Sequence, residues 1–331
     1  MIETDRGVST VADVTLAILL VVAAMGVLVT VVEREEAGHD PMTAEYTAET
    51  IASGTMNVTY DVRAALEAYD GPGAAHDGTD YTDEELRRLA HRPMVAHAAA
   101  AAVLNLEFDL GRLRGEADHG AVELSTEAAA YERAVDEAFQ TRLVESSFDT
   151  QVIAVWEPLD GGPLRGTAEF GQRPPPQADV SASTITVPVD MPSVREQTID
   201  RVDDPDDFDV VATALARSLV EGYLPARRSQ RALESNGVAR DLTAYRYQRF
   251  AQVLETETND VESTVAPALS RRTANATKAN AALTRALAAQ LEAYLEPDDS
   301  TQPAAGPLGN ATTAAERIST GAVRVTVRTW Q

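Results

Sequence analysis

The chain has 331 residues, of which 44% are hydrophobic and 5% aromatic, so alanine, valine and leucine must supply most of any buried core. Its 52 acidic residues outnumber the 28 basic ones, and the net charge of −24 argues against nucleic acid as a partner, because phosphate binding needs clustered cations. A sequence without cysteine excludes disulfides, thiolate catalysis and cysteine-based zinc sites.

The first predicted element is a membrane span at Val14–Val32, where 19 successive residues carry no charged side chain. A helix of this length extends about 28 Å, close to the roughly 30 Å hydrocarbon core of a bilayer. A cleaved secretory signal is the alternative, but its apolar region would be shorter, and charged residues 33–36 follow here. We expect a single-pass protein of the cell membrane, with residues 14–32 in the lipid bilayer. Because the head before the span is short, the N-terminus should be cytoplasmic and the remaining chain outside.

A short motif precedes this span: Arg6, Gly7 and Val8 follow Asp5 at the start of the apolar run. It resembles the processing site of archaeal type IV pilin precursors. The resemblance implies a prepilin peptidase that cuts after the glycine, a mature N-terminus at Val8, and other pilin-like subunits as partners. Bacterial-type pilins carry an acid at the fifth mature residue, whereas Asp13 is the sixth here. Asp13 either faces lipid headgroups or packs against a cation of a neighbouring helix.

Helix and strand patterns alternate after the span. Met56, Val58 and Tyr60 alternate with polar residues, which is typical of a strand. Thr82, with Glu85 three residues later, predicts a capping box at a helix start. We expect helices at 43–53, 82–92, 93–102 and 125–146, and strands at 55–62 and 104–110.

The next segment is the clearest β region. Residues 151–157 and 164–170 flank a turn at Asp160–Pro163 and predict a hairpin, and 180–189 predicts a further strand. From about 194 to 318 the pattern is helical, with a long alanine-rich helix at Ala268–Leu295. Residues 322–330 alternate strongly and should rejoin the sheet of the earlier strands.

The predicted fold class is α+β, with a single N-terminal transmembrane helix followed by a mixed helix and antiparallel-sheet ectodomain. The expected boundaries are a leader at 1–7, a transmembrane helix at 8–32, a linker at 33–42 and an extracytoplasmic domain at 43–331. Within that domain we expect a strand-containing part at 43–191, a helical part at 192–320 and the terminal strand at 321–331.

A wider resemblance covers nearly the whole chain. It is carried by residues 9–16 (STVADVTL), 155–158 (VWEP), 174–176 (PPP) and 327–330 (VRTW). These resemble an uncharacterised haloarchaeal membrane-protein family with a pilin-like N-terminus. The composition agrees, because Lys278 is the only lysine in a strongly acidic chain. The resemblance implies a cell-surface setting, no catalytic activity and no cofactor.

Few residues form a pattern that indicates chemistry. We expect the histidines to lie on the surface, because most of them sit in polar stretches: His39, His76, His91, His97 and His119. The aspartates of the 203–209 loop could hold a hard cation, but they lack the spacing of a calcium loop and are more typical of a solvated turn: Asp203, Asp204, Asp206 and Asp207. Three N-x-Thr sequons make Asn57, Asn275 and Asn310 candidate glycan acceptors.

The leading functional hypothesis is a pilin-like or pseudopilin-like structural subunit of a surface assembly. The alternative is a stand-alone anchored ectodomain that acts as an adhesin, a binding module or an envelope component. A surface enzyme ranks third, because the sequence contains no recognisable catalytic motif.

Overall fold

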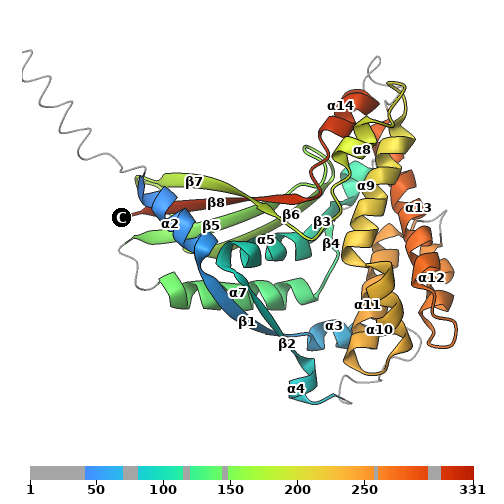
Figure 1. The fold of residues 1–331 in the computed structure, drawn as a ribbon, viewed down its shortest axis with the longest axis horizontal. Helices are drawn as coiled ribbons and strands as arrows, with labels where there is room; N and C mark the ends of the chain where they lie inside the picture. Colours follow the sequence, from blue (N-terminus) through green and yellow to red (C-terminus); the bar gives the residue numbers. More distant parts are fainter. Residues whose placement is uncertain (1–41, 70–80, 115–119, 144–147, 257–259, 297–306) are drawn as a thin grey trace, which may run out of the picture.

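The computed structural model describes residues 42–69, 81–114, 120–143, 148–256, 260–296 and 307–331 (Figure 1). Its helices are α2 (Met42–Ser53), α3 (Arg63–Glu67), α4 (Asp83–Leu86), α5 (Met94–Leu104), α6 (Leu110–Arg114), α7 (Glu127–Leu143), α8 (Arg195–Ile199), α9 (Phe208–Tyr223), α10 (Ala226–Glu234), α11 (Val238–Leu254), α12 (Val261–Leu269), α13 (Ala276–Leu295) and α14 (Ala311–Glu316). Its strands are β1 (Thr55–Asp61), β2 (Arg87–Pro93), β3 (Leu106–Asp109), β4 (Ala121–Glu123), β5 (Asp149–Trp156), β6 (Leu164–Gly171), β7 (Ser181–Pro188) and β8 (Ala322–Trp330).

A six-stranded antiparallel sheet in the order β4-β3-β6-β5-β8-β7 forms the centre of the fold. The predicted hairpin is confirmed: β5 and β6 pair with Ala154 opposite Ala168. The predicted terminal strand is confirmed as β8, which lies between β5 and β7 and places Val325 opposite Ala154 and Ile185. A separate two-stranded ribbon pairs β1 with β2.

Apolar and polar residues alternate along the strands, so one face of the sheet is buried. Val323, Val325 and Val327 of β8 are fully buried, whereas Arg324 between them is exposed. Helix α5 packs on β5, β6 and β8 over the buried face, and α2 and α7 pack beside it. Close approach of α5 depends on Gly166, because a Cβ atom there would lie 1.9 Å from the Ala102 carbonyl oxygen.

The helices α9 to α13 gather at one end of the sheet (Figure 1). Their core is built from leucine and alanine, as the helical spacing predicts: Leu283, Leu287, Leu291 and Leu295 of α13 are all buried. Trp156, at the end of β5, joins the two parts. Its indole is buried, donates a 3.1 Å hydrogen bond to the Thr320 carbonyl, and lies with its ring centroid 6.2 Å from that of Tyr223 in α9.

Two predicted helices are wrong. The capping box of Thr82 and Glu85 is present, but the helix ends at Leu86, and residues 87–93 form β2 instead. Pairing with β1 overrides the local helix preference, because the strand carrying the buried Met56 and Val58 needs a partner. The long helix predicted at 268–295 is broken between α12 and α13, where the Asn275 side chain caps a new helix by accepting from the Lys278 N–H.

The predicted fold class needs a correction. It began with a transmembrane helix, and none of the described helices is both long and apolar enough to cross a membrane. The longest, α13, carries Lys278, Arg285 and Glu292, and the apolar α5 has only 11 residues. The stretch 14–32 lies outside the described residues. The described chain is α+β, with helices packed on antiparallel sheets.

Candidate functional site

The residues predicted for leader processing and helix packing, Arg6, Gly7, Val8 and Asp13, lie outside the described residues. The aspartate loop before α9 is described, and its carboxylates bind its own backbone. Asp207 Oδ2 accepts hydrogen bonds from the N–H groups of Asp203 (2.9 Å) and Asp204 (2.8 Å). Asp204 Oδ1 accepts from the N–H of Asp206 (3.2 Å). Within the described ranges, no group of three or more histidine, aspartate or glutamate side chains could hold a metal ion. The Asp204 and Asp207 carboxylates instead accept hydrogen bonds from the backbone of their own loop.

The three sequon asparagines are exposed, and each has a structural role of its own. Asn57, in β1, pairs through Oδ1 with Nδ1 of His91 across the two-stranded ribbon, at 2.7 Å. Asn275 and Asn310 are the N-caps of α13 and α14 and accept from the N–H of the residue three positions later. Helix capping therefore accounts for two of these asparagines, and glycosylation stays a prediction.

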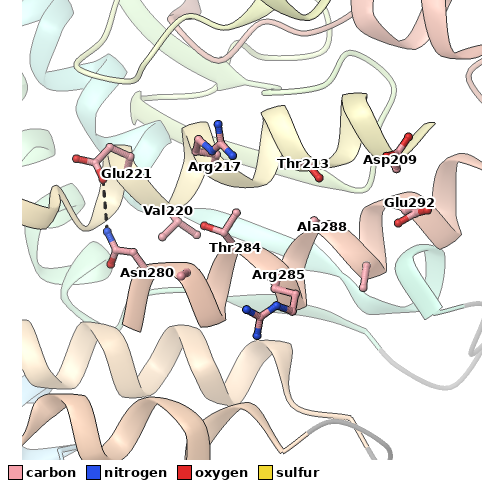
Figure 2. Close-up of a pocket in the computed structure, with 12 residues that line it drawn as sticks. Asp209, Thr213, Arg217, Val220, Glu221, Asn280, Thr284, Arg285, Ala288 and Glu292 are labelled. Atoms are coloured by element: carbon pink, nitrogen blue, oxygen red, sulfur yellow. Dashed lines mark hydrogen bonds between the residues drawn. The ribbon is translucent and has the colours of Figure 1, made fainter. Parts of the chain in front are cut away.

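A groove of about 690 Å³ runs between α9 and α13. Figure 2 shows that its charged side chains do not converge: Arg217 and Arg285 point in different directions, and Glu221 is bonded to Asn280. Burial and the nearby carboxylates of Glu296 and Asp209 raise the pKa of Glu292 at one end of the groove. Because the polar groups are spread along the groove, we do not regard it as the functional site.

A second hollow, of about 630 Å³, lies where the β1–β2 ribbon, α5 and the start of α7 meet α9, α10 and α11. We call it the junction cavity. Its walls contain both apolar and polar side chains: Tyr60, Ala90, Arg92, Ala96, Ala100, Val103, Leu104, Leu124, Ser125, Glu127, Tyr131, Pro188, Val189, Asp190, Met191, Gly222, Tyr223, Leu224, Arg228, Arg246 and Phe250.

A buried ion pair lies in the wall of the junction cavity. Glu127, only 2% exposed, accepts at Oε1 from Nε (2.7 Å) and Nη2 (2.6 Å) of Arg246 in α11. Its second oxygen, Oε2, and the buried Oγ of Ser125 have no hydrogen-bond partner among the described residues. Buried polar atoms are normally hydrogen-bonded, so this wall can still accept or donate hydrogen bonds.

Three tyrosines give the cavity a neutral polar lining. Burial raises the pKa of Tyr131 to about 12 and that of Tyr223 well above its usual value. Burial, followed by the Glu127 carboxylate, raises the pKa of Tyr60. These phenols therefore stay protonated at neutral pH and can donate hydrogen bonds, as Tyr223 does to the carbonyl of Val103.

His97, behind this lining, is fully buried, so the prediction of a surface residue is wrong for it. Nε2 lies 3.2 Å from the Met56 carbonyl, and Nδ1 lies 2.7 Å from the Tyr131 hydroxyl. A carbonyl only accepts, so Nε2 carries the proton and Nδ1 accepts from Tyr131. Burial lowers the pKa of His97, outweighing the Met56 carbonyl, which raises it. The imidazole is neutral and fully bonded, so it ties α5 to β1 and α7.

We predict that His97→Gln destabilises the protein more at about pH 8 than at about pH 5. The folded-state pKa of His97 is lowered, so the stability that the neutral imidazole contributes is full above its unfolded pKa of roughly 6.5 and is lost as the pH falls below it. Urea unfolding of wild type and variant across this range measures the difference. A constant difference would contradict the assignment.

The cavity could not be located from the sequence, because its residues come from segments between Tyr60 and Phe250 that no local pattern connects. The local signal is at the start of α5: His97, the one polar residue of this apolar helix, lies behind the cavity wall, and Arg92, near the end of the preceding β2, lies in the wall. From the sequence alone, α5 resembles a helix that is buried in the core.

The model of a family of unknown function (DUF7284) matches residues 12–330. No curated protein and no solved structure matches the chain.

Proposed function

The chain belongs to this family of unknown function, DUF7284, and we propose that its α+β domain is a non-catalytic binding module of a surface protein. The junction cavity carries the proposal. Its volume, about 630 Å³, falls within the roughly 300–1,000 Å³ of small-molecule sites, and its walls combine apolar side chains with polar groups that could orient a ligand.

The polar groups of the cavity favour binding over catalysis. The Glu127 carboxylate is held by Arg246, and the tyrosines are protonated at neutral pH. The cavity lining therefore offers hydrogen bonds and charge, with no nucleophile paired to a base. This supports a binding module over a surface enzyme.

The proposal predicts that a neutral aromatic probe, N-phenylnaphthylamine, binds the domain with a rise in fluorescence. Ala100→Trp should abolish the rise, because position 100 lines the cavity and the indole would fill it. Ala182→Trp is the matched control, because Ala182 is exposed on the sheet face opposite the helices. Equal binding by both variants would contradict a site in the junction cavity.

We further propose that the protein is a pilin-like subunit at the cell surface of a haloarchaeon. The support is the Arg6-Gly7 motif before an uncharged stretch and the acidic, lysine-poor composition. The stretch 14–32 would associate with the membrane or with neighbouring subunits, and a prepilin peptidase would remove the leader, leaving the folded domain outside the cell.

N-terminal sequencing of the protein from its native cells tests this leader. We expect VSTVAD, the sequence from Val8, and we expect Gly7→Val to leave the precursor uncut. Glycine leaves the backbone unhindered at the bond to be cut, and a β-branched residue would restrict it. A native protein that starts at Met1 would remove the pilin-like reading but leave the binding module untouched.

A further inference from the structure

We infer that the ligand of the junction cavity is an organic anion, with one negative group on an apolar body. The inference rests on the proposed function, since it names the ligand class of the same cavity. The evidence is the charge at the cavity, which differs in sign from the charge of the whole chain.

Arginines from three elements line the cavity: Arg92 from β2, Arg228 from α10 and Arg246 from α11. Glu127 neutralises Arg246. Arg92 and Arg228 are exposed at the edge of the cavity, and neither forms an ion pair with a described residue. Three arginines against the two carboxylates of Glu127 and Asp190 give this lining a positive balance in a chain of net charge −24, which favours an anion at that place.

The guanidinium group suits this role, because its planar donors bind a carboxylate, sulfonate or phosphate oxygen pair at two points. The Glu127 and Asp190 carboxylates in the same lining disfavour a second negative charge on the ligand. We therefore infer a single anionic group, held between β2 and α10 by Arg92 and Arg228.

The rest of the lining defines the body of the ligand. Val103, Leu104, Leu124, Met191 and Phe250 supply apolar side chains to the cavity. The neutral phenol of Tyr60 adds aromatic surface with a hydrogen-bonding tip, and Tyr223, whose hydroxyl already donates to the Val103 carbonyl, adds aromatic surface. An apolar or aromatic body of small-molecule size fits this surface, whereas a free inorganic anion would leave the apolar walls unused.

The test compares two probes that differ by one charge: neutral N-phenylnaphthylamine and anilinonaphthalene sulfonate, titrated into the full chain in the same concentrated salt. We expect the sulfonate probe to bind roughly tenfold more tightly, as expected for charge-assisted hydrogen bonds to arginine. Arg92→Gln and Arg228→Gln should each remove most of this advantage and leave the affinity of the neutral probe unchanged. Unchanged binding of the neutral probe also shows that the variants are folded.

Arg227→Gln is the matched control, because Arg227 is the neighbour of Arg228 on α10 and is also exposed, but does not line the cavity. Equal affinities of wild type for the two probes would overturn the anion inference alone. Equal losses of affinity for the sulfonate probe in the Arg227 and Arg228 variants would also overturn it, because the net charge of the protein would then be the cause. Failure of the neutral probe to bind wild type would overturn the proposed function as well.

Discussion

Replacing Gly166 by alanine should destabilise the domain by about 3 kcal/mol, near the upper end for overpacked sites. The added Cβ would lie 1.9 Å from the carbonyl oxygen of Ala102 and 3.0 Å from its carbon. Both are backbone atoms of α5, so no side chain can turn aside, and the helix would have to lift from the sheet. Chemical unfolding followed by circular dichroism measures the loss.

Gly120→Ala is the matched control for this substitution, because a Cβ atom there meets no described atom within 4 Å. We expect its unfolding free energy to stay within about 0.5 kcal/mol of wild type. If the two alanine variants proved equally stable, the close packing of α5 against β6 would be wrong.

Removing the arginine of the buried ion pair should have a comparably large effect. Arg246→Ala leaves the Glu127 carboxylate, which is 2% exposed, without its cation. Breaking such a pair from one side costs roughly 3–5 kcal/mol, and we expect the low end because the Arg246 side chain is 38% exposed. Thermal and urea unfolding should both show the loss.

A double variant separates loss of the cation from loss of packing. In Glu127→Gln with Arg246→Ala, neither charge of this pair remains, so part of the stability should return relative to Arg246→Ala alone. A double variant that is no more stable than the single one would show that Arg246 contributes through packing and not through its charge.

The elements that could be predicted are those whose structure is decided by residues close together in the sequence. The hairpin of β5 and β6 follows from alternation around a glycine turn, and β8 follows from nine alternating residues. The capping box at Thr82 was predicted for the same reason, because its bonds lie within four residues.

The wrong predictions concern residues whose structure depends on contacts with residues far away in the sequence. Residues 87–93 have a helical pattern but pair with β1. At the break before α13, Gln230 of α10 donates to the Ala274 carbonyl and accepts from the Ala276 N–H. His97 was assigned to the surface with the other histidines, most of which sit in polar stretches, and the partners that it contacts in the core, Met56 and Tyr131, are 41 and 34 residues away. The junction cavity could not be predicted for the same reason, since it exists only where the sheet part meets the helical part.

Quenching of Trp156 fluorescence tests the central claim most directly, because a ligand in the junction cavity must lie within energy-transfer range of this residue. Trp156 and Trp330 are the only tryptophans, so Trp330→Phe leaves a single emitter. The Trp156 ring centroid lies 6.2 Å from that of Tyr223, a residue of the cavity wall. N-phenylnaphthylamine absorbs where tryptophan emits, so a probe in the junction cavity should quench nearly all of the emission and saturate at one probe per chain. A probe that binds while Trp156 keeps its emission would lie elsewhere, and the junction cavity would not be the binding site.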